Sequence, residues 1–352
     1  MKNTIIFAAG GGNDVFSAIA YIKSTNKKNV SLISVLGLTP FHSTNENDKI
    51  EPPYIIPTVN MSRYIVKDPP KKIFCMESLI PEIINKELPE LINYACISSK
   101  YSAIEQSKYL NDLFKSWGLS KTDTKIEIVD FGGDILTDKD QSSIISPELD
   151  AFTLAVVDNL KFIDTKIIVC FPGVDGELSS EYLTNYCNNS IDHIEINNDL
   201  LLKSLSSIYK YVKIYRPGNT IPNMIKILNN QDDLNLYKHW IINDKKITFN
   251  KKLTINWDLQ KYFWVFDLNF VISKNIFVQV FNSIDYDLLM LKDYIINIYD
   301  NQKHDENSIQ SSDLFLQYIR SDNDGKYTNK QLNYNNDEKI IFIDRIPTCL
   351  KY

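Results

Sequence analysis

The first half of the chain alternates short apolar runs with segments of helical spacing. Apolar runs of strand length lie at Thr4–Ala8, Val30–Leu36, Ala95–Ser98, Ile126–Phe131 and Ile167–Phe171. Amphipathic or helix-forming segments lie at Asp14–Ile22, Leu79–Leu91, Ser102–Trp117, Ser146–Leu160 and Ser179–Cys187. Strands that alternate with helices are typical of parallel sheets with helical crossovers. The pattern therefore predicts an α/β fold, with a Rossmann-like, doubly wound and mainly parallel sheet.

The second half is less regular. Helices are expected at Leu200–Lys213, Asn223–Asn229 and Ser283–Ile298, and strands at Phe263–Phe270 and Lys339–Ile346. No linker-like change of composition separates the halves. We therefore expect a single α/β domain over residues 1–352, with a regular strand–loop–helix core at 1–190. Residues 191–352 would form a less regular α/β extension that completes the fold.

Composition narrows the class of protein. The chain has 352 residues, of which 44% are hydrophobic, a formal net charge of −6, and four arginines. Without a dense basic stripe, a nucleic-acid partner is not expected. No apolar run approaches the ~20 residues of a membrane helix, and the N-terminus shows no signal peptide. The five cysteines form no metal-binding or disulfide spacing, so we expect a cytoplasmic protein with reduced thiols.

Acidic residues follow three of the predicted strands, each within a glycine-containing loop. They are Asp14, then Asp130 with Asp134, and then Asp175 with Glu177. The carboxyl ends of parallel strands meet at one edge of the sheet, and ligands bind there. The sequence therefore predicts a ligand site at this edge.

The first loop is Gly10-Gly11-Gly12-Asn13-Asp14, directly before a helix. Glycine permits close approach of the backbone, and a helix N-terminus offers free N–H groups to an anion. Val15 stands where a dinucleotide fingerprint has its third glycine, and no acidic residue ends the second strand, so an NAD-dependent oxidoreductase is disfavoured. Two interpretations stay open for this loop, namely ligand contact and simple capping of the helix by Asp14.

The second loop, Asp130-Phe131-Gly132-Gly133-Asp134, places two carboxylates around a glycine turn at the end of a strand. Such a pair can hold Mg²⁺, bind sugar hydroxyls or act as an acid and a base. The alternative is a turn that satisfies its own backbone. The position at a strand's carboxyl end favours function.

Further candidates lie nearby in the predicted fold. Asp175 and Glu177 bracket a glycine after Gly173, and Asp150 lies near the start of a helix. We expect Asp130, Asp134 and Asp175 to bind a metal, and Glu177 or Asp150 to act as acid or base. Arg216, in the turn before Gly218, is a candidate for binding an anionic group, although a structural ion pair explains it equally well.

Five segments in this order resemble the domain-of-unknown-function family 1152 of archaea and bacteria. They are Ala8–Val15, Val129–Asp134, Ser146–Ala151, Pro172–Leu178 and Tyr262–Asp267. The resemblance implies the α/β fold and the location of the site. The family has no assigned activity, so the resemblance implies no reaction.

The leading hypothesis is an enzyme that performs metal-assisted hydrolysis or group transfer on a small phosphorylated or ribose-containing metabolite. Clustered carboxylates repel one another unless a cation or a proton lies between them, which is the reason to expect Mg²⁺ as cofactor. Gly10–Gly12, Gly132, Gly133 and Gly173 would shape the ligand site. The alternative is a non-catalytic small-ligand sensor or interaction protein on the same fold. The oligomeric state does not follow from the sequence.

Overall fold

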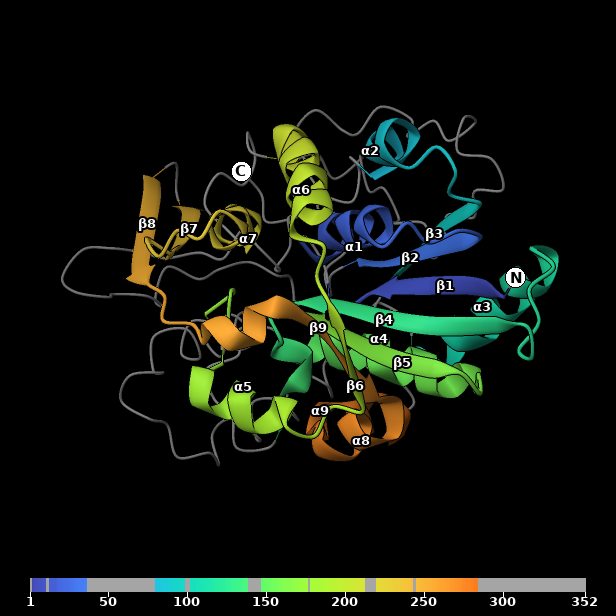
Figure 1. The fold of residues 1–352 in the computed structure, drawn as a ribbon. Helices are drawn as coiled ribbons and strands as arrows, with labels where there is room; N and C mark the ends of the chain where they lie inside the picture. The colour runs from blue at the N-terminus through green and yellow to red at the C-terminus, as the bar shows by residue number, and fades with distance from the viewer. Residues whose placement is uncertain are drawn as a thin grey trace.

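The computed structural model describes residues 2–10, 13–36, 80–98, 102–138, 147–176, 178–212, 220–242 and 245–283 (Figure 1). The strand expected at Lys339–Ile346 and the turn at Arg216 lie outside these residues. So does most of the helix expected at Ser283–Ile298.

A seven-stranded sheet forms the centre of the fold, with the strand order β3-β2-β1-β4-β5-β9-β6. The strands are β1 (Asn3–Ala8), β2 (Val30–Leu36), β3 (Asn93–Ser98), β4 (Thr124–Phe131), β5 (Thr165–Cys170), β6 (Asp192–Glu195) and β9 (Tyr262–Asp267). Strands β1 to β5 are parallel, whereas β9 runs antiparallel to both β5 and β6. The expected α/β class and mainly parallel, Rossmann-like sheet are confirmed.

The strand order reverses between β1 and β4. From β1 the chain moves outward through β2 to β3, and it then returns to β4 on the other side of β1. In doubly wound sheets such a switch point leaves a crevice at the carboxyl ends of the two strands, where ligands bind. The loop after β1 leads to Asp14 and the loop after β4 contains Asp134, so both lie at this point.

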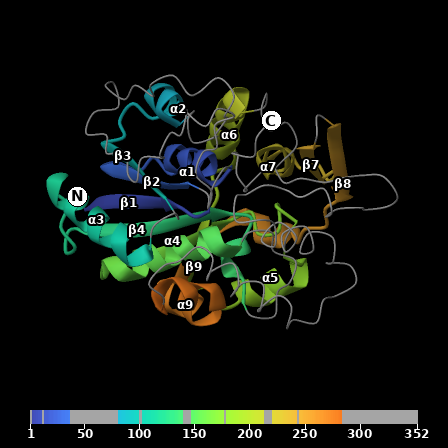
Figure 2. The ribbon, with the colours of Figure 1, turned by 180° about the vertical axis from the view of Figure 1, so that it is seen from behind.

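Helices cover both faces of the sheet (Figures 1 and 2). On one face lie α1 (Asn13–Ser24), α2 (Ile80–Glu87), α6 (Asn198–Val212) and α7 (Thr220–Leu228). On the other lie α3 (Ala103–Ser116), α4 (Pro147–Leu160), α5 (Ser180–Cys187), α8 (Leu268–Lys274) and α9 (Ile276–Ser283). Consecutive residues of β1 point into opposite layers, because Ile5 packs in one core and Ile6 in the other. Burial on both faces explains why the parallel strands are continuous apolar runs.

The second half contains elements that the hydrophobic pattern did not predict. Strand β6 was missed, and so was a separate antiparallel hairpin formed by β7 (Asn235–Ile242) and β8 (Lys245–Lys252). The strand expected to reach Phe270 ends at Asp267. The Asp267 side chain accepts a hydrogen bond from the Phe270 N–H at 3.0 Å. Asp267 therefore caps the N-terminus of α8, and the strand ends there.

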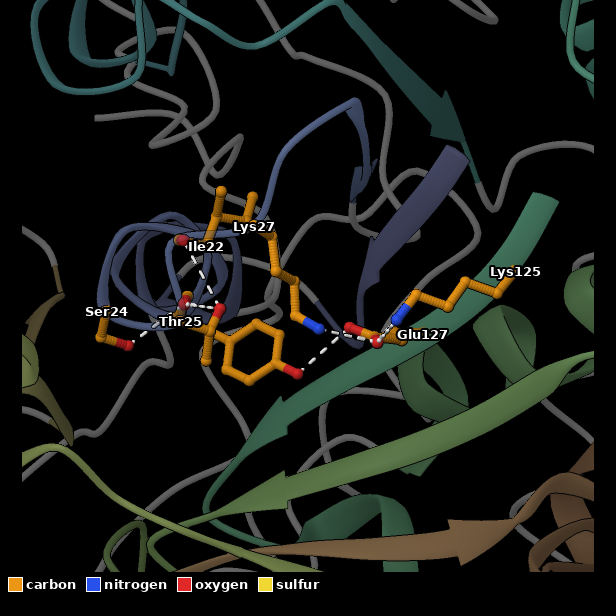
Figure 3. A network of polar contacts seen from close by, with 7 residues as sticks. Ile22, Ser24, Thr25, Lys27, Lys125 and Glu127 are labelled. Atoms are coloured by element: carbon orange, nitrogen blue, oxygen red, sulfur yellow. Dashed lines mark hydrogen bonds and ion pairs between the residues drawn. The ribbon is translucent and has the colours of Figure 1, made fainter. Parts of the chain in front are cut away.

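A buried polar network joins α1 to β4 on the face covered by α1 (Figure 3). Glu127 accepts hydrogen bonds from Tyr21 Oη at 3.1 Å and from Lys27 Nζ at 2.9 Å. Lys125 Nζ forms an ion pair with the same carboxylate at 3.0 Å. Burial alone would raise the pKa of Glu127, but Lys27 and Lys125 outweigh burial and lower it. The network therefore holds α1 against the sheet. Glu127 lies on the opposite face of β4 from Ile126 and Ile128.

Candidate functional site

Five aspartates gather around the switch point, and each comes from a different element. They are Asp14 in the first turn of α1, Asp130 near the end of β4, Asp134 at the start of the 3₁₀ turn η4 (Asp134–Leu136), Asp150 in α4, and Asp175 in the loop after β5. Their exposed fractions lie between 0% and 6%. Carboxylates are almost never this buried unless they are paired or bind a metal. Their burial therefore makes this group the candidate site of the structure.

Asp130 is the most enclosed of the five. It is fully buried, and its Oδ2 accepts a hydrogen bond from the Gly133 N–H at 2.9 Å. Gly132 and Gly133 have φ angles of 134° and 97°, which allow the chain to fold back over the carboxylate. Oδ1 has no hydrogen-bond partner among the described residues. A buried oxygen of this kind requires a partner, and the described residues do not supply one.

Three of the carboxylates lie within reach of a single ion. One oxygen from each of Asp130, Asp134 and Asp150 lies within 4.8 Å of the other two. Hard cations such as Mg²⁺ bind carboxylate oxygens, and this spacing makes the three residues a candidate group for holding one ion. Asp150, which we expected to act as acid or base, thus offers a metal ligand. Asp175 does not belong to this group of three.

Two glycines allow carboxylates to approach the backbone. A Cβ atom at Gly10 would lie 2.8 Å from both Asp14 Oδ2 and Asp150 Oδ1. A Cβ atom at Gly132 would lie 1.9 Å from Asp175 Oδ2, well inside contact distance. Both glycines have positive φ, 71° at Gly10 and 134° at Gly132. Any side chain at these positions would displace the acidic groups.

The electrostatic environment of Asp130 is strongly acidic. Burial first, and then the charges of Asp134, Asp150, Asp14 and Asp175, raise the pKa of Asp130 well above its usual range. Apart from burial, all of these influences come from neighbouring carboxylates. A divalent cation would reverse this effect because it favours the ionised form of every carboxylate around it.

The loop that carries Asp175 is held from two sides. The Gly173 N–H donates to the Gly132 carbonyl at 2.6 Å, which joins the loops after β5 and β4. Gln260, in the 3₁₀ turn η5 (Trp257–Lys261), donates through Nε2 to the Pro172 carbonyl at 2.9 Å. Gln260 is buried, so this contact is shielded from water. Sequence reasoning missed Gln260, because a single glutamine in a polar segment belongs to no motif.

Several predicted residues lie outside the described part of the chain, namely Gly11, Gly12, Glu177 and Arg216. Asn13 begins α1. The described residues therefore unite Gly10, Asp14, Asp130, Gly132, Gly133, Asp134, Asp150, Gly173 and Asp175 around one edge of the sheet. Their catalytic and binding roles stay predictions.

Fold and site together define a doubly wound α/β protein with a buried carboxylate centre at its switch point. The family model described as "Protein of unknown function (DUF1152)" matches residues 5–206, more than half of the chain, and the chain belongs to this family. The matched residues contain all five aspartates, whereas β9 and Gln260 lie beyond them. A comparison with curated proteins finds no match. In the part of the chain described by the structure, every helix is too short or too polar to cross a membrane.

Proposed function

We propose that the protein is an enzyme that binds Mg²⁺ at Asp130, Asp134 and Asp150. The reaction would be hydrolysis or group transfer on a small phosphorylated or ribose-containing metabolite. The observation that supports this best is the group of three buried carboxylate oxygens within 4.8 Å of one another. Asp130 Oδ1, buried and without a hydrogen-bond partner among the described residues, fits a ligand to a cation.

The donor set favours Mg²⁺ over softer metals. All three residues are carboxylates, which suit Mg²⁺, Ca²⁺ and Mn²⁺, whereas zinc and copper sites use histidine and cysteine. When bound, such a cation supplies electrophilic assistance to a phosphoryl or carbonyl oxygen and lowers the pKa of a bound water. The carboxylates would fix the position of the ion. Asp175, which we expected from the sequence to bind the metal, lies beside Gly132 and would serve instead as a proton-transfer group.

Thermal unfolding in the presence of candidate ligands tests the proposal. The purified chain is heated with nucleotides, nucleosides or sugar phosphates, each with and without Mg²⁺. A ligand at 100 times its dissociation constant stabilises the folded state by about 2.7 kcal/mol, which is readily detected. The same samples are then assayed for product.

The informative variant is Asp130→Asn, which keeps the shape of the side chain and removes its charge. We expect the Mg²⁺-dependent shift to vanish in Asp130→Asn and to persist in the control Asp112→Asn, whose carboxylate is exposed on α3. A shift that survives in Asp130→Asn would contradict the proposed metal site. Ligand binding without product would instead support the non-catalytic sensor.

A further inference from the structure

A series of hydrogen bonds through two peptide groups ends on the Asp130 carboxylate. The Gly133 N–H donates to Asp130 Oδ2 at 2.9 Å. The carbonyl of that same peptide group is the carbonyl of Gly132, and it accepts from the Gly173 N–H at 2.6 Å. Each peptide group thus accepts a hydrogen bond at its C=O and donates one at its N–H, in the direction of Asp130.

The side chain of Gln260 is the first donor in this hydrogen-bond series. The peptide group that contains the Gly173 N–H has the Pro172 carbonyl at its other end, and this carbonyl accepts from Gln260 Nε2 at 2.9 Å. Nε2 also donates to the Asn256 carbonyl at 3.1 Å, at the start of η5. An amide nitrogen carries two hydrogens, so both find an acceptor and the amide is held in one orientation.

Both ends of the hydrogen-bond series are shielded from water. Gln260 is 5% exposed, and Asp130 is 0% exposed. Hydrogen bonds are electrostatically stronger in such surroundings, and bonds in a row strengthen one another by about 10–30% each. A bond to an ionised carboxylate is also stronger than one to a neutral acceptor. The donor at Gln260 can therefore act on Asp130 without touching it.

The series engages one oxygen of Asp130 and leaves the other. Oδ2 accepts from the Gly133 N–H, whereas Oδ1 is buried and has no hydrogen-bond partner among the described residues. A carboxylate that is held at Oδ2 has less freedom to rotate, so the position of Oδ1 is fixed as well. Residues that orient metal ligands from behind set the affinity of metal sites in this way.

The oxygen of the Gln260 amide counts against a role in packing alone. Oε1 is buried and has no hydrogen-bond partner in the described part of the chain. A buried acceptor without a partner destabilises the folded state, and an apolar side chain of similar size would avoid this cost. The bonds that Nε2 donates are therefore the contribution that an amide makes at this position.

We propose that Gln260 is a positioning residue for Asp130, acting through the two peptide groups between them. The hydrogen-bond series would hold Asp130 at Oδ2 and present Oδ1 to the cation. This inference rests on the proposed function and deepens it. It gives a role in the cation site to η5, a segment that lies beyond residues 5–206, the part matched by the family model.

The affinity for Mn²⁺ tests the proposal on the full chain without a substrate. Gln260→Met keeps the length of the side chain and removes its donors. We expect this variant to raise the Mn²⁺ dissociation constant, measured by electron paramagnetic resonance of the free ion, by about tenfold. The matched control is Asn93→Leu, because Asn93 is also a buried amide and donates to Ser31 Oγ at 3.1 Å, at the amino ends of β2 and β3. The control should bind Mn²⁺ as tightly as the wild-type chain.

Nuclear magnetic resonance tests the hydrogen-bond series itself and needs no metal. The chain has 11 glycines, so labelling with ¹⁵N-glycine gives a simple amide spectrum. Loss of the donor at Gln260 should weaken the polarisation of both peptide groups, so the amide protons of Gly173 and Gly133 should move upfield in Gln260→Met. They should keep their positions in Asn93→Leu. If Gln260→Met fails to fold, Gln260→Glu decides by the same readouts, because its carboxylate keeps the shape and cannot donate at neutral pH.

The outcomes separate this inference from the proposed function. If Gln260→Met binds Mn²⁺ as tightly as the wild-type chain, or if the Gly133 proton keeps its position, the positioning role is overturned and the metal site stands. An equal loss of affinity in Asn93→Leu would also overturn it, because the effect would then be general to buried amides. If the wild-type chain binds no Mn²⁺, the proposed function fails, and the Gly133 proton alone decides whether Gln260 acts on Asp130.

Discussion

The close contact between Gly132 and Asp175 yields a quantitative prediction for Gly132→Ala. The new methyl group would lie 1.9 Å from Asp175 Oδ2 and 2.6 Å from Asp175 Cγ, so the Asp175 loop must move. Overpacking of this kind costs about 1–3 kcal/mol. The φ of 134° at Gly132 adds about 1–3 kcal/mol of backbone strain for any other residue. We therefore expect Gly132→Ala to lower the free energy of unfolding by about 2–6 kcal/mol.

The chain offers a matched control at Gly118, which follows α3. Gly118 also has a positive φ, 72°, but a Cβ atom there would meet no atom within 4 Å. Gly118→Ala should therefore cost only the left-handed backbone conformation, about 1–2 kcal/mol. Urea unfolding followed by circular dichroism measures both variants against the wild-type chain.

A double variant separates the steric cost from the backbone cost. Asp175→Ala removes the two closest atoms and leaves Cβ, which lies 3.0 Å from the new methyl group. In that background Gly132→Ala should cost nearly as little as Gly118→Ala, with a coupling free energy of about 0.5–3 kcal/mol between the sites. If Gly132→Ala costs no more than Gly118→Ala in the wild-type background, the reasoning about the Gly132–Asp175 contact is wrong.

Two further predictions concern the scaffold. Glu127→Gln should lower the free energy of unfolding by about 2–4 kcal/mol near neutral pH, because it leaves Lys27 and Lys125 without their carboxylate. The lowered pKa of Glu127 means that its contribution is present above the unfolded value of about 4.3 and is lost as pH falls through the folded value. Urea unfolding at a series of acid pH values should thus show that the free energy of unfolding falls less steeply with pH in the variant than in the wild-type chain. The same pH profile in both would contradict this. Ser102→Ala should lower the free energy of unfolding by about 0.5–2 kcal/mol, because Ser102 and Glu105 form a capping box at the start of α3. The control Ser116→Ala, at the exposed end of the same helix, should change it by no more than about 0.5 kcal/mol. Equal effects at the two serines would contradict the role of the cap.

The parallel half of the fold could be predicted because its signals are local. Strands buried on both faces are continuous apolar runs, and helix ends show capping residues such as Ser102 and Ser179. The place of Asp14 and Asp130 at one edge then followed from the parallel order alone. The observed ends of some elements differ from the predicted ends where one residue adopts an unusual backbone conformation. Strand β5, for example, ends before Phe171, whose φ is 49°.

The parts of the fold and of the candidate site that the sequence did not predict depend on contacts between residues far apart in the chain. All four residues of β6 are exposed, so no apolar pattern marks this strand, and it exists because it pairs with β9 about seventy residues later. The sequence shows Asp150 only as an acidic residue near the start of a helix, and it does not show which residues Asp150 approaches. Only the packing of α4 beside η4 brings Asp150 to Asp130 and Asp134. Gln260 reaches Pro172 for the same reason, through the fold and not through any motif.

The placement of β9 between β5 and β6 has a consequence for synthesis of the chain on the ribosome. Strand β9 is made about ninety residues after β5, which at about 5–20 residues per second is a delay of about 5–20 s. During that interval the apolar strand β5 has an open edge, and β6 has no partner in the sheet. An open apolar edge is a template for pairing with other chains. The nascent protein is therefore exposed to aggregation through the edge of β5 from the completion of β5 until β9 pairs with it.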